Sequence, residues 1–360
     1  MDEQRSRHPF HMYDAIIVQP GAFVRALEKN ETVVDGFAAE AASCGRLFIV
    51  GIGTSYHAAR IGEHLFREYS GGLDARAVHS FDFALYGPAL APGDCVMGVS
   101  HRGTKRYTAR ALQRARESGC RTALVTGEGG TVSVGADAVF RTVAQERSAA
   151  HTVSYTTAIS ILAHLAGRIG YHRTGSGVPG EGFLREEIPA ALRAALGAEG
   201  EVERLAREHA GRRRIWLAGG GPSAVTAEEV ALKIKETSYL QAEGMSTETM
   251  LHGPFQCVEA EDLFILVAPA GAAQKRTLEV AELVEEIGGA CLVVGDGTQD
   301  PQENADTLTV LQVPEPLGAL TCLLPLQLFA YHLALARGTN PDAFRTDDPR
   351  FARADVSGRL

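Results

Sequence analysis

A short apolar strand, a glycine turn and an amphipathic helix follow one another in both halves of the chain, and this repeat limits the possible folds most. The first copy begins at residues 47–51, and the second begins at residues 214–223 (RIWLAGGGPS). Further short apolar runs alternate with helical patterns, at 75–79, 95–100, 122–127 and 138–143 and again at 263–269, 290–295 and 308–313. Such alternation indicates a parallel α/β sheet. We predict an α/β protein of two tandem three-layer α/β/α sandwiches, each with a mostly parallel, flavodoxin-like sheet.

The domain boundaries follow from composition along the chain. A length of 360 residues suits two domains of ordinary size. The stretch from about 171 to 200 is rich in Gly, Pro and Ser before it becomes helical, which is typical of a joint between domains. We therefore predict an N-terminal segment and helix (1–44), a first domain (45–170), a linker and helix (171–200), a second domain (201–336) and a C-terminal tail (337–360).

Composition excludes several classes of function. A formal net charge of −9 argues against a nucleic-acid binder, which needs a basic face. The six cysteines form no CxxC pair, so we expect reduced core thiols and no disulfide or zinc site. The N-terminal residues lack a signal-peptide core, and Pro325, Gln327 and His332 interrupt the longest apolar stretch, which predicts a buried helix. We expect a cytoplasmic protein with no membrane, metal or cofactor requirement.

The first candidate site is the glycine turn that includes Gly53, Thr54 and Ser55. It lies between an apolar strand and a helix. Small residues allow the backbone to approach an anion closely, and the two hydroxyl groups add donors. The alternative is a tight strand-to-helix connection with no ligand.

The second candidate site is a basic turn, also between a strand and a helix. It contains Ser100, His101, Arg102 and Lys105. Arginine binds a phosphate through two parallel N–H bonds, and lysine adds a point charge. In a protein of net charge −9 this local cluster favours anion binding, although a solvated basic turn is the alternative.

The third candidate site combines Lys233 and Glu236 with His252. The first two are three residues apart and share one face of a helix whose Val230 and Ile234 are predicted to be buried. A carboxylate near an apolar wall suits proton transfer near neutral pH. His252 precedes Gly-Pro and is therefore expected at a loop tip. The alternatives are a surface ion pair and a loop histidine with no role.

Together these segments resemble the sugar-isomerase (SIS) domains of the glucosamine-6-phosphate synthase family. GIGTSYHAA is similar to the family's first sugar-binding turn, and ALKIKETSYLQAEGMSTETMLHGP to its catalytic helix and histidine loop. LLPLQLFAYHLALARGTNPD resembles the last helix and HMYDAIIVQPGAF the opening segment. The similarity runs in order from about residue 8 to 346, without the glutamine-hydrolysing half. It also extends to the deglycase and amino-sugar deaminase branches.

The resemblance implies a role for each matching residue. Ser55 would contact the sugar, and the residues from Ser100 to Lys105 would bind its phosphate. Glu236 would move a proton between C1 and C2, while Lys233 would hold a hydroxyl or polarise an enediol oxygen. His252 would help to open the sugar ring in the site of a partner subunit, which implies a homodimer. The expected ligand is a small sugar phosphate or a related anion.

The sequence also departs from the family pattern. Arg102 and Lys105 replace hydroxyl residues in the phosphate loop, so the anion could differ from a phosphate. His151 stands where the family has a small serine, which alters the sugar pocket. Because the glutaminase half is not present, nitrogen from glutamine would require a separate ammonia-supplying subunit.

The tail carries a further departure. The family places a lysine there that forms a Schiff base with the ketose, but the last lysine of this sequence is Lys275. Arginine cannot replace it, because it stays protonated. A substrate that already carries an amine would not need this lysine. Asp347 and Asp348 fall where the tail should close over the site and could hold a substrate ammonium, or could form a solvated acidic turn.

These observations favour an enzyme that acts on an amino-sugar or ketosamine phosphate by Glu/His acid–base catalysis. The reaction would be isomerisation with deamination or deglycation, or the reverse amination with free ammonia. Two alternatives remain: a plain aldose–ketose phosphosugar isomerase, and a non-catalytic sensor that binds a sugar phosphate and regulates a partner. The retained Glu236 and His252 favour catalysis.

Overall fold

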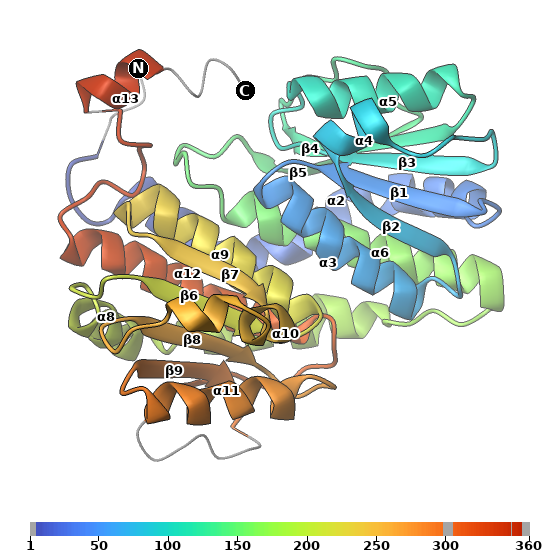
Figure 1. Cartoon of the computed structure of the whole chain (residues 1–360). Helices are drawn as coiled ribbons and strands as arrows, with labels where there is room; N and C mark the ends of the chain where they lie inside the picture. The colour runs from blue at the N-terminus through green and yellow to red at the C-terminus, as the bar shows by residue number, and fades with distance from the viewer. Residues whose placement is uncertain (1–4, 298–304, 347, 355–360) are drawn as a thin grey trace. The chain divides into compact units, whose positions relative to one another are not determined.

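The computed structural model describes residues 5–297, 305–346 and 348–354 and divides into two compact units (Figure 1). We call them the first-sheet unit and the second-sheet unit. The first-sheet unit contains residues 18–146, 153–189 and 348–354. The second-sheet unit contains residues 5–17, 147–152, 190–297 and 305–346. The predicted N-terminal segment is thus shared between the units, because its first helix belongs to the second-sheet unit.

The first-sheet unit has five parallel strands in the order β2-β1-β3-β4-β5. Its elements are α2 (Gln19–Ala41), β1 (Arg46–Gly51), α3 (Thr54–Tyr69), β2 (Asp74–His79), α4 (Ser80–Tyr86), β3 (Asp94–Val99), α5 (Arg106–Glu117), β4 (Arg121–Glu128), β5 (Ala138–Ala144), α6 (Val153–Thr174), the π-helical turn η1 (Phe183–Glu187) and α13 (Pro349–Ala354).

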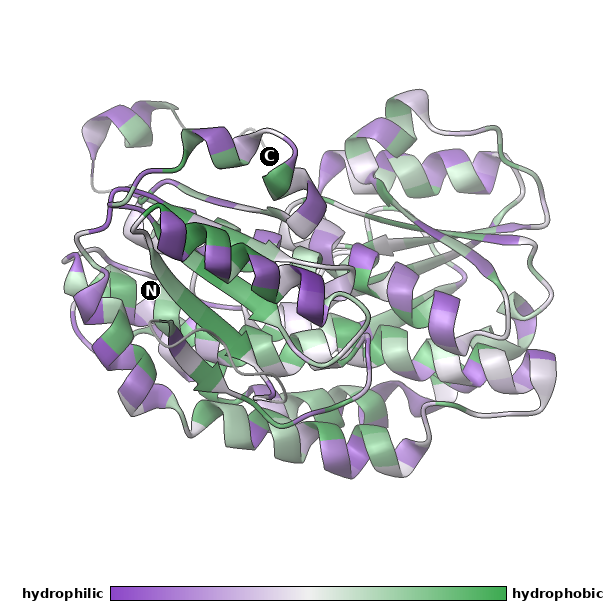
Figure 2. Ribbon diagram, turned by 60° about the horizontal axis from the view of Figure 1, so that its bottom comes forward, coloured by the Kyte–Doolittle hydropathy of each residue, from purple (hydrophilic) through white to green (hydrophobic). Residues whose placement is uncertain are grey.

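Helices cover both faces of this sheet, which explains why its central strands are mostly apolar after their first residues. Every residue of β3 is buried. Helices α2, α3 and α6 pack together on one face, and α4 and α5 pack on the other through a core that includes Phe48, Phe83 and Leu112. Figure 2 shows the same arrangement most clearly in the second-sheet unit, on the left, where green apolar strands lie beside helices of mixed hydropathy. Parallel sheets that are covered on both faces carry this near-continuous apolar pattern.

The second-sheet unit repeats the plan, with parallel strands in the order β10-β9-β8-β6-β7. Its elements are α1 (His11–Ile17), α7 (Ile188–Leu196), which begins at the unit boundary, α8 (Glu199–Glu208), β6 (Ile215–Gly219), α9 (Pro222–Ser238), β7 (Ala242–Ser246), α10 (Thr247–Leu251), the 3-10 turn η2 (Pro254–Cys257), β8 (Leu263–Ala268), α11 (Gln274–Glu286), β9 (Ala290–Gly295), β10 (Asp306–Thr309) and α12 (Gly318–Ala336). Helices α8, α9 and α12 pack together, and α11 packs against β8 and β9.

Helix α12 is the longest apolar segment of the described chain. Its 19 residues have the length and hydropathy of a membrane span, but 89% of that stretch is buried inside the protein. It packs against α8, α9 and α1. The prediction of a buried core helix is therefore confirmed.

The expectation that every cysteine lies in the core holds for five of the six. These five are buried free thiols, whereas Cys257, the last residue of η2, is an exposed one. The expectation is therefore wrong for Cys257.

Both sheets place their first strand between the second and the third. In the first sheet β1 lies between β2 and β3, and in the second β6 lies between β7 and β8. This is the flavodoxin-like strand order that was predicted. In such sheets the chain leaves the first and third strands toward opposite faces, which opens a ligand-binding crevice at the carboxyl ends of these two strands.

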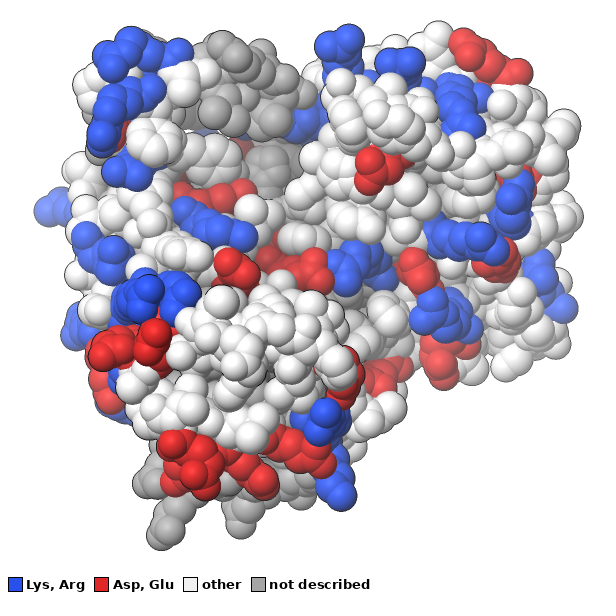
Figure 3. Space-filling view, viewed as in Figure 1, with Lys and Arg blue, Asp and Glu red and all other residues white. Residues whose placement is uncertain are grey.

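On the face drawn in Figure 3, basic and acidic side chains are interspersed over most of the surface. No broad basic patch covers this face, in agreement with the formal net charge of −9.

Candidate functional site

The glycine turn follows β1 and leads directly into α3. A Cβ atom added to Gly51 would lie 2.4 Å from the backbone oxygen of Ser55, so the strand can approach the helix only with glycine here. Gly53 adopts φ +56° at the N-cap of α3, where no side chain caps the helix. Thr54 and Ser55 form the first turn of the helix and are half-buried. The turn therefore combines backbone and hydroxyl donors at an uncapped helix N-terminus.

The basic turn follows β3, the parallel neighbour of β1. Val50 pairs with Gly98 one residue before the end of each of these two strands. The glycine turn and the basic turn therefore leave from adjacent strand ends at the switch point of the first sheet. This is the position at which sheets of this order bind ligands.

The backbone holds the basic turn in a fixed shape. Gly103 has φ +71°, and an added Cβ atom would lie 1.8 Å from the backbone oxygen of Thr131. The N–H of Thr131 donates to the carbonyl of Arg102, and the hydroxyl of Ser133 donates to that of Gly103. The turn is thus tied to the loop after β4, and only glycine fits at position 103.

Ser100 and the two cations of the turn have unused binding capacity. The hydroxyl of Ser100 is buried without a hydrogen-bond partner in the described structure. Arg102 is exposed and Lys105 is half-buried, and neither forms an ion pair with another described residue. Burial, and then the charge of Arg102, lowers the pKa of Lys105. Two cations that repel each other, with no carboxylate between them, favour a bound anion.

His101 has a different environment from these cations. It is buried, and its Nε2 atom accepts a hydrogen bond of 3.1 Å from the backbone N–H of Glu146. Its carbonyl accepts from the backbone of Gly127 and the side chain of Gln145. Burial lowers the pKa of the imidazole, so the ring is neutral near pH 7. This environment favours Arg102 and Lys105 as the cations for a ligand, with His101 as support for the loop.

Helix α9 of the second-sheet unit carries a buried chain of three charges. The Nζ atom of Lys233 lies 2.6 Å from Oε2 of Glu236 and 3.4 Å from Oε1 of Glu229. Lys233 and Glu229 are 1% and 0% exposed, and the Glu236 side chain is 20% exposed. The prediction that Val230 and Ile234 are buried is confirmed. Glu236 is thus the member of the chain that solvent or a ligand can reach.

Glu229 was not predicted from the sequence. Its spacing provides a signal, since residues 229, 233 and 236 are four and then three apart and so share one helical face. From the sequence, however, a glutamate is expected at the surface, because a fully buried glutamate is rare unless it is paired. Here Lys233 supplies the pairing.

His252 lies at a loop tip, as predicted. It follows α10, adopts φ −98° and ψ 45°, and precedes Gly253, whose φ of +139° ends the helix. Its side chain is 74% exposed. The Nδ1 atom donates to the backbone oxygen of Glu248 at 2.7 Å, which leaves Nε2 directed away from this contact. The ring is fixed on one side and accessible on the other.

The tail beyond α12 is held against the end of α9. The hydroxyl of Thr339 donates to the carbonyl of Thr237, and that of Tyr239 to the carbonyl of Ala343. Arg345 stacks over the Tyr239 ring at 5.2 Å. The tail therefore packs against the same end of the helix that carries Glu236.

The remaining predicted residues have different positions. His151 is half-buried in the segment 147–152, which belongs to the second-sheet unit and donates from Ala149 to the backbone of Asp342. Asp348 accepts the backbone N–H of Arg350 at 2.9 Å and pairs with its guanidinium at 2.7 Å. Its carboxylate thus has local partners at the start of α13. Asp347 lies outside the described residues.

The corresponding turns of the second sheet are already filled by the chain itself. Gly221 has φ 52° and ψ −123°, close to the 56° and −132° of Gly53. After β8, however, the N–H of Ala272 donates to Glu315 and that of Ala270 to Asp296. A Cβ atom at Gly220 would lie 2.1 Å from the Cβ atom of Ala273. Carboxylates of the protein occupy the anion position here, so the first sheet carries the open turns.

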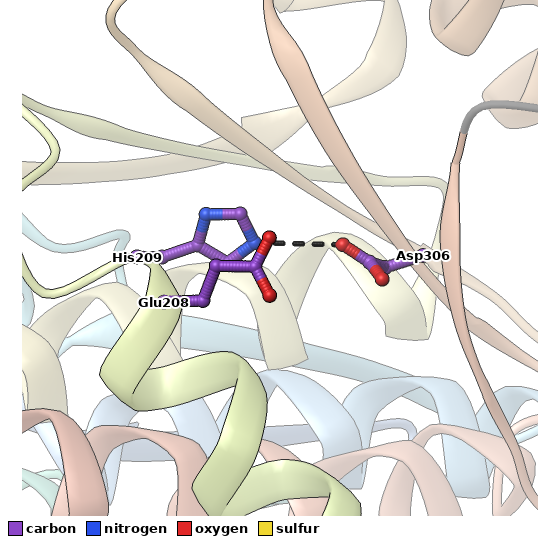
Figure 4. Close-up of side chains that lie close together, drawn as sticks. All are labelled: Glu208, His209 and Asp306. Carbon is purple, nitrogen blue, oxygen red and sulfur yellow. Dashed lines mark ion pairs between the residues drawn. The ribbon is translucent and has the colours of Figure 1, made fainter.

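One group of side chains in the described structure has the composition of a metal site. It consists of Glu208, His209 and Asp306, shown in Figure 4. Nε2 of His209 lies 3.6 Å from Asp306, while Nδ1 accepts from Arg212, so the proton is on Nε2. Arg204 forms ion pairs with both carboxylates. The arrangement is that of an ion-pair network, since a metal would need an unprotonated nitrogen.

Comparisons with known proteins agree with this architecture. The SIS domain family matches residues 41–167 and 210–337. A glutamine–fructose-6-phosphate aminotransferase (isomerizing) of Thermococcus kodakarensis is 27% identical over 347 residues, which are 94% of this chain and 57% of that protein. The chain thus spans little more than half the length of this relative.

Two solved structures have the same fold. The C-terminal domain of glucosamine-fructose-6-phosphate aminotransferase from Francisella tularensis superposes with a TM-score of 0.85 at 21% identity, covering 93% of this chain and 99% of that one. A tagatose-6-phosphate ketose/aldose isomerase from Escherichia coli gives a TM-score of 0.78 at 19% identity, with coverage of 94% and 96%.

Proposed function

Because the chain belongs to the SIS domain family, we propose that it is an enzyme that converts an amino-sugar or ketosamine phosphate. The observation that carries this proposal is the buried Glu229–Lys233–Glu236 chain on α9. Burying three charges costs stability unless each is paired, and such an arrangement is a frequent feature of catalytic sites. The similarity to a sugar-phosphate aminotransferase supports the substrate class.

Glu236 is the proposed proton carrier. Its carboxylate removes a proton from the carbon that bears the nitrogen and gives an enaminol. The same carboxylate then returns the proton to the neighbouring carbon of the C1–C2 pair, which leaves an imine. Addition of water to the imine carbon expels the amine, so the atoms balance without a cofactor. Lys233, 2.6 Å from Oε2, orients the carboxylate for both transfers.

The two turns of the first sheet are the proposed binding site for the phosphate end of the substrate. Arg102 and Lys105 supply charge, and the buried Ser100 hydroxyl supplies a hydrogen bond that no described residue uses. Gly53, Thr54 and Ser55 add donors from the neighbouring strand end. Charge-assisted hydrogen bonds to phosphate are among the strongest in proteins.

A substrate that carries its own nitrogen would make a lysine in the tail unnecessary. Residues 337–360 contain no lysine, so an enzyme amine from this segment is not available for a Schiff base. A substrate with its own amine forms the imine internally. His252, with one nitrogen fixed and the other exposed, is the proposed acid–base group for ring opening in the site of a second copy of the chain.

Incubation with three substrate sets tests the proposal: glucosamine-6-phosphate, fructose-6-phosphate with ammonium, and fructoselysine-6-phosphate. We expect turnover of at least one, which Glu236→Gln removes and the exposed control Glu243→Gln preserves. Proton exchange with neutral sugar phosphates alone would indicate a plain aldose–ketose isomerase. Binding without any turnover would indicate a sensor. Either of these outcomes would overturn the proposal.

A further inference from the structure

Asp342, in the tail after α12, caps a helix at the other end of the chain. Its Oδ2 atom accepts the backbone N–H of His11, and its Oδ1 atom accepts that of Met12, each at 2.8 Å. These N–H groups belong to the first turn of α1, where they have no partner within the helix. A carboxylate is a strong acceptor for them, because such hydrogen bonds are charge-assisted. Both carboxylate oxygens of Asp342 are thus bonded to α1.

Helix α1 is itself anchored in the second-sheet unit. It packs against α12, and the side chains of Met12 and Ile16 are fully buried. The hydroxyl of Tyr13 donates to the carboxylate of Glu199, the first residue of α8, at 3.0 Å. The helix therefore offers Asp342 a fixed attachment, which holds this part of the tail in place.

The same turn of the tail holds the segment that carries His151. The backbone carbonyl of Asp342 accepts the N–H of Ala149 at 3.0 Å. The buried hydroxyl of Ser148 donates to the carbonyl of Pro341, the residue before Asp342, at 3.4 Å. Two hydrogen bonds thus join the tail to a strip of chain that ends two residues before His151.

The following residues of the tail contact the end of α9. The hydroxyl of Tyr239 donates to the carbonyl of Ala343 at 3.2 Å and accepts the N–H of Arg345 at 3.0 Å. Tyr239 and Arg345 have φ 57° and 52°, which are unfavourable for residues other than glycine, so their contacts must hold the backbone in this shape. Tyr239 directly follows α9 and is three residues from Glu236. The turn thus reaches the helix end that carries the proposed proton carrier.

We propose that Asp342 is a positioning residue, which fixes the His151 segment and the tail against the helix end that carries Glu236. This inference rests on the proposed function. Asp342 acts through the groups that it holds, since its own carboxylate is bonded to the backbone of α1. Proton transfer requires the carboxylate of Glu236 and the substrate carbon in a defined geometry, and a misplacement of about 1 Å can lower the rate by about 10².

The kinetic test compares Asp342→Ala and Asp342→Asn with the control Asp262→Asn. Asp262 is a buried carboxylate of the same unit, with Arg214 and Trp216 as partners at the start of β6. Asp342→Ala should lower kcat per folded molecule by about tenfold or more at nearly constant KM, because the turns proposed to bind the phosphate stay intact. Asp342→Asn keeps one acceptor oxygen and should lose less. Asp262→Asn should lower Tm but leave kcat of the folded protein unchanged.

Amide hydrogen exchange tests the same claim without a substrate. In Asp342→Ala, exchange should become faster by about tenfold or more in the first turn of α1, in residues 147–152 and in residues 339–346, because all three depend on one side chain. Exchange in β8 should stay unchanged. Asp342→Asn supplies the same measurement if the alanine variant does not fold.

Two results would overturn the proposal. One is faster exchange confined to α1, which would make Asp342 a helix cap alone. The other is a kcat that Asp342→Ala leaves unchanged, or that Asp262→Asn lowers equally. If the wild type turns over none of the three substrate sets, the proposed function fails, and the exchange data still decide whether Asp342 holds these segments.

Discussion

Lys233 is the residue whose environment says most about the chemistry. It is 1% exposed and lies between two carboxylates on its own helix. A surface ion pair, the alternative considered from the sequence, is excluded by this burial. A cation in this position both compensates the fully buried Glu229 and orients Glu236, which joins the stability of α9 to its proposed catalytic role.

Replacing Lys233 by methionine should therefore destabilise the protein. The change leaves the buried carboxylate of Glu229 without its cation, and breaking a buried pair in this way costs about 3–5 kcal/mol. Urea unfolding measures the loss. The matched control is Lys235→Met, two residues along α9 and exposed, which should change the free energy of unfolding by less than about 0.5 kcal/mol. Equal effects of the two variants would contradict the assigned environment.

The lowered pKa of Lys105 predicts how the affinity for a phosphorylated substrate depends on pH. Only the protonated amine attracts a phosphate, and burial together with Arg102 lowers the pKa of this group. Affinity should be present at pH values below that lowered pKa and lost as the pH rises through it. The KM for the phosphorylated substrate should thus begin to rise below the usual lysine pKa of about 10.4. In Lys105→Arg the KM should stay flat over this range, and an identical profile in both proteins would contradict the role of Lys105.

At the scale of elements, glycine at position 103 allows the basic turn to adopt the shape proposed to bind the phosphate. Gly103 and Gly129 both have φ +71°, but an added Cβ atom at Gly103 would lie 1.8 Å from Thr131, whereas none lies within 4 Å at Gly129. Gly129→Ala should cost only the strain of the left-handed backbone, about 1–2 kcal/mol. Gly103→Ala should cost more and should raise KM, because the clash displaces the basic turn. Thermal unfolding and substrate kinetics measure the two effects, and similar losses in both variants would contradict this account.

Most elements could be predicted because buried strands and amphipathic helices leave strong patterns. Strand β3 is buried along its whole length and apolar after Asp94, and the predicted run differs from the observed strand by one residue. Strand β7 was missed because it is an edge strand with Glu243 and Gly244 and only one buried residue. The sequence signal of a strand depends on the packing of its side chains, so it is weak in an edge strand with few buried residues.

The candidate site was predictable where chemistry follows local spacing. Lys233 and Glu236 are neighbours on one helix, and His252 at a loop tip follows from the Gly-Pro sequence after it. The environment of His101 was not predictable, because its partner Glu146 is 45 residues away in the sequence. The blocking of the second-sheet turns by Glu315 likewise depends on tertiary contacts.

For the whole molecule, the proposal requires two copies of the chain. His252 is 74% exposed, as expected for a side chain that acts in the site of a partner copy. Glu236→Gln and His252→Asn should each be inactive alone. Mixed after subunit exchange, they should recover about a quarter of the wild-type activity, because half of the dimers then carry one intact site. No recovery despite proven exchange would contradict a shared site.

The central claim is that the Glu236 carboxylate moves a proton between two carbons of the substrate. The most direct measurement is NMR of the sugar carbons during turnover in deuterium oxide. We predict deuterium at C1 or C2 with the wild-type protein, and incorporation slowed by a factor of about 10² or more in Glu236→Gln, the usual size of a general acid–base contribution. Equal incorporation by the two proteins would contradict the account.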